Sequence, residues 1–235
     1  MDAAAAKAAY VRSMFGRIVA RYDLVNRLMT AGQDVRWRRI AARMVKPQGR
    51  LALDVGSGTS DFAFELVNHG ARAVVGIDFC APMLSAAKIK IAQRNEGKRI
   101  FLAAADAMSL PFADSTFGCV VNAFVLRNVG DLKATLIELC RVLEPGGHLV
   151  CLELTHAPPR VEALFSFYFN RMMPRLGAMV TGQGDAYRYL AGSLEGHPDA
   201  DALASMMTDA GFANVSYVRL GLGAIAIHLG EKLRT

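Results

Sequence analysis

Two acidic residues flank a short glycine-rich turn, and this stretch is the first place where the sequence could support chemistry. The apolar run Leu51–Val55 leads into Gly56-Ser57-Gly58, and residues 62–68 follow with a helical pattern. Glycine lets the main chain approach a ligand closely. A turn of this kind lies at the carboxyl end of a first parallel strand in nucleotide-binding folds. The stretch therefore predicts a binding loop for a nucleotide-type ligand.

The side chains of the loop restrict which ligand it can hold. A phosphate-binding P-loop needs a lysine that this turn lacks. A dinucleotide loop has a third glycine where this chain has Asp61, and an acid there would repel a pyrophosphate. Asp54 and Asp61 instead suit a ligand with a cationic amino acid end, and S-adenosylmethionine fits that description. Each acid alone is also typical of a helix cap or of a solvated surface.

Two further strands lead to acids. The strand Ala73–Asp78 places Asp78 about 20 residues beyond the loop, where an acid binds ribose hydroxyls in such folds. The strand at residues 99–103 leads to Asp106, which could accept the adenine amino group of the same ligand. The loop and the two acids together predict an adenosine-type site at one edge of the sheet.

Ionisable groups also follow the fourth and fifth strands. Phe117–Ala123 ends in Phe124-Val125-Leu126-Arg127-Asn128-Val129. Ligands of open α/β sheets bind outside the carboxyl ends of strands, so this hexapeptide should border the reacting centre. Glu153 lies near the end of the strand at residues 148–154, where it is either a functional acid or a structural one.

A helical preface occupies residues 1–49. Within it, Tyr22, Asp23 and Asn26 fall in about one helical turn and can face one spot. A local cap network would use the same residues. Asp34 is expected to cap the next helix, which carries Trp37.

Strands and helices alternate after the preface, which predicts an α/β fold with a mostly parallel sheet and helices on both faces. The last two strands, at residues 213–220 and 223–229, are joined by a short turn and must therefore pair antiparallel. We expect a single domain over residues 1–235. Residues 157–197 interrupt the alternation as a substrate-side insertion, in which residues 164–174 are rich in aromatics and methionine. That segment either accepts a flexible apolar ligand or forms a core helix.

Local signals set several boundaries. Asp131 should cap a helix at residues 132–143, and Pro145-Gly146-Gly147 should turn the chain before the fifth strand. The helix at residues 83–94 has apolar residues on one face and lysines on the other.

Composition narrows the partners and the location. The net charge of +6 comes without a lysine or arginine tract, so no nucleic-acid groove is predicted. Basic residues cluster loosely between Arg12 and Arg50, which favours either an anionic membrane surface or a solvated helix face. No uncharged run of 18 residues and no signal-peptide pattern is found. The four cysteines form no C-x-x-C pair and no zinc-type cluster, which predicts no metal site and reduced thiols in a cytoplasmic protein.

Several motifs, taken in order, make the chain recognisable. It resembles the ubiquinone/menaquinone biosynthesis C-methyltransferase family from about residue 11 to residue 193. The motifs are Tyr22-Asp23-Leu24-Val25-Asn26 with Leu28-Met29-Thr30 and Trp37, then Leu53-Asp54-Val55-Gly56-Ser57-Gly58-Thr59-Ser60-Asp61, then Gly76-Ile77-Asp78-Phe79 with Met83-Leu84, then Asp106-Ala107 with Leu110-Pro111-Phe112, then Leu126-Arg127-Asn128-Val129, then Arg141-Val142-Leu143-Glu144-Pro145-Gly146-Gly147 with Leu152-Glu153, and finally Ala186-Tyr187-Arg188-Tyr189-Leu190 with Ser193.

This resemblance implies a seven-stranded Rossmann-like methyltransferase fold with one antiparallel strand, and S-adenosylmethionine as cofactor. The cofactor-binding residues it implies, together with those of the loop, are Asp54, Gly56, Gly58, Thr59, Asp78, Phe79, Asp106, Ala107 and Ala123.

The implied reaction is methylation of a ring carbon of a reduced polyprenyl quinone. Arg127 is expected to stabilise the quinolate oxygen and Asn128 to orient it, while Tyr22, Asp23 or Glu153 takes the proton. The substrate is demethylmenaquinol, or alternatively the benzoquinol of the ubiquinone pathway, or both. The isoprenoid tail would lie on residues 165–173. The protein would rest at the inner face of the membrane, and the family also suggests a homodimer.

The chain departs from the family pattern at five positions. Ala123 stands where serine is common, so a hydroxyl contact to the cofactor is lost or replaced by backbone. Val125 replaces a glycine, which bears on the shape of the quinone pocket. The others are Ser60 for glycine, Cys80 for serine and Glu144 for lysine.

Three other functions fit these residues less well. An NAD-dependent oxidoreductase fits Asp78 but not Asp61. A DNA or RNA amino-methyltransferase would carry an acidic or Asn-Pro-Pro-aromatic motif after the fourth strand, which Asn122-Ala123-Phe124-Val125 is not. A non-catalytic S-adenosylmethionine-binding partner protein is disfavoured by the Arg127-Asn128 pair.

Overall fold

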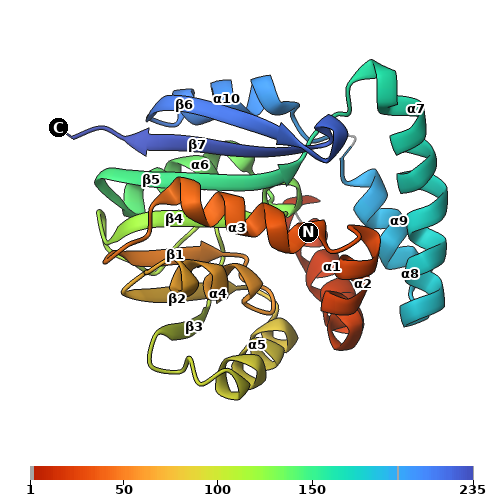
Figure 1. Ribbon diagram of the computed structural model, residues 1–235, viewed down its shortest axis with the longest axis horizontal. Coiled ribbons are helices and arrows are strands. Elements are labelled where there is room, and N and C mark those ends of the chain that lie inside the picture. The colour runs from red at the N-terminus through yellow and green to blue at the C-terminus, as the bar shows by residue number, and fades with distance from the viewer. Residues whose placement is uncertain (1–2, 195, 235) are drawn as a thin grey trace.

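The computed structural model describes residues 3–194 and 196–234, and within them seven strands form one sheet in the order β3-β2-β1-β4-β5-β7-β6 (Figure 1). The strands are β1 Leu51–Val55, β2 Ala73–Asp78, β3 Ile100–Ala104, β4 Phe117–Ala123, β5 Leu143–Leu154, β6 Phe212–Leu220 and β7 Ile225–Lys232. Strands β1 to β5 pair in parallel, whereas β7 runs antiparallel to both β5 and β6. The predicted mostly parallel sheet with an antiparallel final pair is confirmed.

The strand order reverses between β1 and β4. Strand β1 pairs with β2 on one side and with β4 on the other, so that Val55 lies between Ile77 and Asn122. The connections leave β1 and β4 in opposite directions, which opens a crevice beyond their carboxyl ends. The sheet order alone therefore places a ligand site there.

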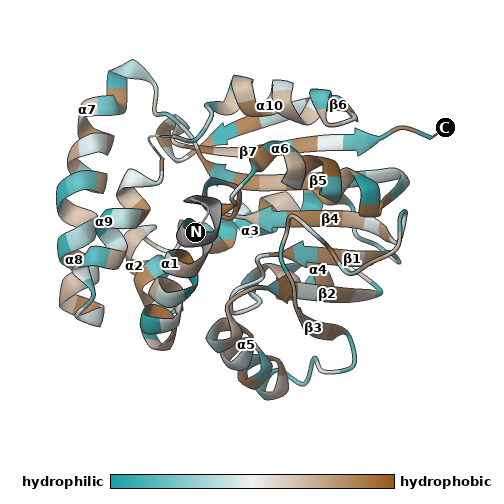
Figure 2. Cartoon of the chain, turned by 180° about the vertical axis from the view of Figure 1, so that it is seen from behind, coloured by the Kyte–Doolittle hydropathy of each residue, from teal (hydrophilic) through white to brown (hydrophobic). Residues whose placement is uncertain are grey.

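Helices cover both faces of the sheet. Helices α3 (Gln33–Val45) and α4 (Asp61–Asn68) pack on one face, with α5 (Ala81–Gln93) beside β2 and β3. Helices α6 (Leu132–Val142) and α10 (Ala200–Asp209) pack on the other face, which Figure 2 shows from behind. Because the central strands are covered twice, their residues form nearly continuous apolar runs.

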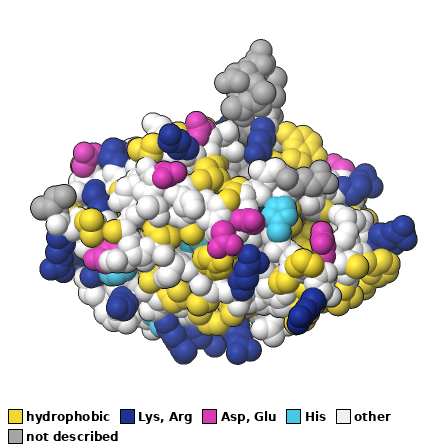
Figure 3. Space-filling model, turned by 90° about the horizontal axis from the view of Figure 1, so that it is seen from above, with side chains coloured by type: hydrophobic (Ala, Val, Ile, Leu, Met, Phe, Trp, Pro, Cys, Tyr) yellow, Lys and Arg dark blue, Asp and Glu magenta, His cyan; other side chains and the backbone are white. Residues whose placement is uncertain are grey.

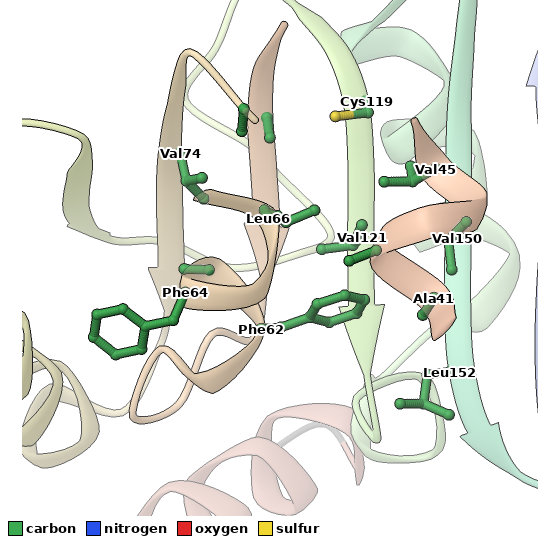
Figure 4. Close-up of a cluster of buried hydrophobic side chains, with 14 of the residues drawn as sticks. Ala41, Val45, Phe62, Phe64, Leu66, Val74, Cys119, Val121, Val150 and Leu152 are labelled. Carbon is green, nitrogen blue, oxygen red and sulfur yellow. The ribbon is translucent and has the colours of Figure 1, made fainter. Parts of the chain in front are cut away.

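The core between α3, α4 and the sheet is built from buried apolar side chains. Phe62 and Leu66 of α4 pack beside Val121 of β4, and Val45 of α3 packs against Val150 of β5 (Figure 4). Burial of side chains of this size stabilises the fold by about 1.5–3 kcal/mol each. This core fixes the ends of β1 and β4, from which the site is built.

A separate helical layer stands beyond the carboxyl edge of the sheet (Figure 1). It comprises α1 Ala3–Ile18, α2 Tyr22–Met29, α7 Pro159–Phe167, α8 Met173–Thr181 and α9 Gly184–Gly192, with a π-helical turn at Tyr168–Met172. Tyr187 of α9 is buried with Met14 and Ile18 of α1. Its ring lies so close to Gly177 that an added Cβ there would be 2.1 Å away. The preface and the insertion, which are far apart in sequence, thus form one unit.

Local predictions had mixed outcomes. Asp131 caps α6, as expected, and Asp199 caps α10, and each carboxylate accepts a hydrogen bond from a backbone N–H group. The expected cap at Asp34 is wrong, because α3 begins at Gln33 after Gly32 and the Asp34 carboxylate is buried among arginines. The expected turn at Pro145-Gly146-Gly147 lies within β5 as an irregularity, because Leu143 pairs with Phe117, His148 already pairs with Cys119, and Gly146 has φ of +76°.

Among the helices of the described residues, none has the length and apolarity needed to cross a bilayer.

Candidate active site

A cleft lies beyond the carboxyl ends of β1, β2, β3 and β4, and because it borders the predicted cofactor loop we call it the cofactor-side cleft. It encloses about 800 Å³ of empty space, part of it open to solvent. Nine of the predicted site residues line it, namely Tyr22, Gly56, Gly58, Asp78, Phe79, Asp106, Ala107, Ala123 and Asn128. Val11 and Phe15 also line it, and nothing in the sequence marks them beyond their apolar character.

Asp78 is fixed against the glycine loop. Its carboxylate accepts hydrogen bonds from the backbone N–H groups of Gly58 at 2.9 Å and Cys80 at 2.8 Å. Burial raises the pKa of Asp78, although these N–H groups act in the opposite direction. Gly58 has φ of +52°, a conformation that favours glycine. The carboxylate is therefore held in place at the wall of the cleft, with lone pairs left for ligand hydroxyls.

Val125 packs against the other glycine of the loop. Gly56 has φ of +65°, and a Cβ added to it would lie 2.3 Å from Cγ2 of Val125. Val125 lines the cofactor-side cleft, so this departure from the family pattern shapes that cleft from within. Ser60, another departure, adopts φ of +69°, as the glycine common at its position would do readily.

Asp54 and Thr59 lie outside this cleft. They border a small polar cavity beneath the loop, together with Asp23, Arg38 and Asp61. Burial raises the pKa of Asp54 to about 8, and Arg38 only partly offsets this. The hydroxyl of Thr59 donates to Oδ1 of Asp23 at 2.6 Å. Of these two predicted cofactor residues, Thr59 is thus engaged by the protein itself.

A network of ion pairs joins the loop to the helical layer. Lys90 of α5 contacts Asp23 of α2 at 2.7 Å and also pairs with Asp61 at the start of α4. Arg27 contacts Asp61 at 2.9 Å and pairs with Asp34. Burial acts to raise the pKa of Asp61, but Lys90 outweighs it and lowers the pKa. The negative charge of Asp61 is thus neutralised within the protein.

The sequence missed Lys90, because helical periodicity placed it on the lysine face of α5. The side chain is only 19% exposed and reaches around the helix end towards α2.

A larger apolar cavity lies between α2, α3 and the insertion. It encloses about 1170 Å³ of empty space and is lined by Asn26, Met29, Trp37, Arg127, Leu154, Phe165, Tyr168, Phe169, Met173, Leu190 and Leu222, among others. Phe15, Tyr22 and Phe124 line both this cavity and the cofactor-side cleft. The two spaces therefore meet at these three rings, and we call the larger one the acceptor cavity.

Arg127 supplies a buried cation to the acceptor cavity. Its side chain is 7% exposed and pairs with Glu153, which is 1% exposed. Oε1 of Glu153 also accepts from the backbone N–H of Leu154 at 2.9 Å. The Arg127 guanidinium lies 5.5 Å from the centre of the Phe124 ring.

The other predicted catalytic residues are distributed around this pair. Tyr22 borders both spaces, and burial raises the pKa of its phenol, so that the hydroxyl stays protonated at neutral pH. Asn128 lines the cofactor-side cleft and donates to the carbonyl of Phe124 at 3.3 Å. Asp23 lies apart, with its carboxylate held by Lys90 and Thr59.

The sheet order and the acid-tipped crevice define the Rossmann-like fold of S-adenosylmethionine-dependent methyltransferases. A solved methyltransferase of this kind from Thermotoga maritima superposes with a TM-score of 0.68 at 18% identity, covering 94% of this chain and 99% of that one. The [4+2]-cyclase SpnF superposes with a TM-score of 0.60 at 22% identity, covering 86% of this chain and 81% of that one. At these identities the likeness concerns the fold alone.

The chain belongs to the ubiE/COQ5 methyltransferase family, whose model matches residues 3–232. It is 43% identical over 222 residues to the demethylmenaquinone methyltransferase of Thermus thermophilus, covering 93% of this chain and all of that one. It is 42% identical over 227 residues to the ubiquinone/menaquinone biosynthesis C-methyltransferase UbiE of Desulfotalea psychrophila, covering 94% of this chain and 90% of that one. The chain is therefore an S-adenosylmethionine-dependent methyltransferase.

The residues of the cofactor-side cleft fit this cofactor. Asp78 presents a fixed carboxylate where ribose hydroxyls are bound in such folds. Phe79, Ala105 and Met108 form an apolar wall suited to a flat base, with Asp106 beside them. Tyr22 and Phe124 lie where this cleft meets the acceptor cavity.

Proposed function

We propose that the chain methylates a ring carbon of a reduced polyprenyl quinone, with demethylmenaquinol as the first candidate. The junction of the cofactor-side cleft with an apolar cavity bordered by two buried guanidiniums, those of Arg127 and Arg38, carries this proposal. An apolar ring with an ionisable hydroxyl matches such a cavity. The name of the Thermus thermophilus relative supports demethylmenaquinol. The name of the Desulfotalea psychrophila relative keeps the ubiquinone-pathway benzoquinol as the second candidate.

The cofactor, when bound, supplies a methyl group already activated on a sulfonium. The chain must hold the acceptor carbon in line and stabilise the negative charge that develops on the quinol oxygen. Arg127 is suited to that charge, because it stays protonated and lines the acceptor cavity. Tyr22 can donate a second hydrogen bond from its neutral hydroxyl. Asn128 holds the turn that carries Arg127 through its bond to Phe124.

Glu153 is the base that this arrangement favours among the three predicted candidates. Its carboxylate pairs with Arg127, which lines the acceptor cavity, and it can take the quinol proton through a water molecule. Tyr22 is disfavoured because burial keeps its phenol protonated. Asp23 is disfavoured because Lys90 and Thr59 engage its carboxylate away from the acceptor cavity. We assign Asp23 to positioning α2.

The isoprenoid tail would leave the acceptor cavity past Phe165 and Phe169 of the insertion, whose rings stack 4.3 Å apart. Leu222 borders this cavity and is 74% exposed.

We propose that the outer face of the insertion rests on an anionic membrane. Arg160, Leu164, Phe167 and Arg171 are all exposed and recur every three or four residues, which gives one apolar stripe with basic ends. Hydrophobic and basic side chains adjoin at the right-hand end of Figure 3, where α7 lies in Figure 1. The basic residues of the preface are less suited, since Arg17, Arg27 and Arg38 are engaged in ion pairs. The homodimer stays a prediction.

The test is methyl transfer from labelled S-adenosylmethionine to two acceptors in parallel, a reduced demethylnaphthoquinone and a reduced benzoquinone precursor, each with anionic vesicles. Label in the naphthoquinol alone supports the first candidate, and label in both supports a dual-pathway enzyme. Label in neither, with cofactor binding intact by calorimetry, would refute the proposed acceptor.

A further inference from the structure

A further cavity borders Arg127 and shares Val129 and Gly130 with the lining of the cofactor-side cleft. It encloses about 910 Å³ of empty space, partly open to solvent, and is lined by Lys7, Arg127, Tyr189, Ser193 and His197, among others. Arg127 also lines the acceptor cavity. A single side chain thus borders both the space proposed for the quinol ring and a polar route to solvent.

Three residues of this lining, and Glu153 paired with Arg127, have buried polar atoms without a partner in the described residues. Within the part of the chain that the structure describes, Nε2 of His197, Nε of Arg127, Oη of Tyr189 and Oε2 of Glu153 have no hydrogen-bond partner. Buried polar groups are normally satisfied, and in a cavity of this size water satisfies them. His197 is only 5% exposed, and its carbonyl is held by Nε2 of His156 at 3.0 Å. The cavity is therefore suited to a fixed chain of water molecules.

We propose that this cavity carries away the proton that ring methylation releases, and that His197 relays it. The inference rests on the proposed function. When a ring C–H becomes C–CH₃, the new bond forms as the sulfur–methyl bond breaks, and sulfur keeps that electron pair. The ring hydrogen leaves as a proton while its electron pair restores the aromatic ring. One proton per methyl group must therefore pass from the quinol to solvent, and Glu153, then water, then His197 provide a path.

The charges around His197 suit a relay. Burial lowers the pKa of His197, so its imidazole is neutral at pH 7 and can accept a proton. Glu153 of β5 raises this pKa, whereas Arg127, His156 and His228 of β7 lower it. Lys7 of α1 is occupied by the carbonyls of Arg127 and Val129, at 3.1 and 3.0 Å. An imidazolium formed here would be weakly held and would release its proton readily.

A single-turnover experiment tests the relay. The enzyme with bound S-adenosylmethionine is mixed with reduced demethylnaphthoquinone, and a pH indicator follows the proton while quenched samples follow the methylated product. In the natural chain the proton and the product should appear together. In His197→Gln the proton should lag behind the product at least about tenfold, and added imidazole should shorten the lag in His197→Ala. His69→Gln, a histidine change at the far end of α4, should show no lag.

Equal rates of proton and product in His197→Gln would overturn the relay while leaving the methyltransferase proposal intact. If that variant fails to fold, Tyr189→Phe serves instead, because the hydroxyl it removes has no partner among the described residues. A lag of about threefold is expected there, and no lag would again overturn the relay. No methylation of either quinol by the natural chain would remove the proposed function, and this inference with it.

Discussion

Charged groups near the cofactor loop are mostly paired with one another, whereas charged groups near Arg127 keep buried atoms without a partner in the described residues. Around the loop, Asp23, Asp34 and Asp61 each contact a lysine or an arginine, at distances such as 2.7 Å from Lys90 to Asp23. Around Arg127, the ion pair with Glu153 leaves further buried atoms of both residues unpartnered in the described part of the chain.

This difference distinguishes charged groups that hold the fold in place from charged groups that can act on a ligand. A network whose members satisfy one another rigidifies the elements it joins, here α2, α4 and α5. Buried groups with unused hydrogen-bonding capacity are costly unless a ligand or water completes them. The ion-pair network around the loop, which we call the paired region, therefore sets the geometry of the cofactor loop. The groups around Arg127 keep hydrogen-bonding capacity that quinol and water can use.

The substitution with the largest expected effect on turnover is Arg127→Ala. We expect kcat for quinol methylation to fall about 10³-fold, because the developing oxyanion loses its charged partner. The affinity for S-adenosylmethionine, measured by calorimetry, should change less than about twofold, because Asp78 and the loop are untouched. Full turnover in this variant would contradict the assigned role.

Stability separates the chemical effect from the structural one. Removing Arg127 leaves Glu153 buried and unpaired, which should cost about 3–5 kcal/mol in the free energy of unfolding. Adding Glu153→Gln removes that charge and should recover much of the stability in urea titrations. Turnover should stay low in the double variant, because both the cation and the proposed base are absent.

Lys90→Met tests the paired region and should have a smaller effect. Asp23 and Asp61 lose their common partner, so α2 is held less firmly against the loop. We expect about tenfold weaker binding of S-adenosylmethionine and a loss of about 1–3 kcal/mol in stability. Lys88→Met is the matched control, since Lys88 lies on the same helix but is exposed. Equal behaviour of the two variants would show that the network does not position the loop.

The sequence predicted the cofactor side of the molecule well. The strands β1, β2 and β4 are short apolar runs bounded by turn residues, and such signals are local. The crevice follows from the reversal of strand order. The sequence therefore placed Asp78 and Asp106 at the strand ends that border the cleft, and their binding of the cofactor stays a prediction.

The acceptor side depends on contacts that no local pattern contains. Tyr187 packs into the space left by Gly177 and against α1, which joins segments more than 150 residues apart. Lys90 followed the helical period of a solvent-facing residue and still reaches α2. His197 carries no motif. Such positions follow from how the preface and the insertion pack together, which periodicity cannot specify.

Asp54 is the exception within the paired region, and its replacement should have the smallest effect on turnover. Its Oδ2 has no partner in the described residues, and burial raises its pKa from 3.8 to about 8. The carboxyl is thus neutral at pH 7, and Asp54→Asn should change the affinity for S-adenosylmethionine less than about threefold.

The folded natural chain keeps this proton up to about pH 8, whereas the unfolded chain releases it near pH 3.8. The natural chain therefore loses stability as pH rises through this window. Asp54→Asn should lose less, so its stability relative to the natural chain should increase between pH 4 and 8 in urea titrations. A constant difference across that range would mean that Asp54 is ionised in the folded protein, with its charge directed at the cationic end of the cofactor.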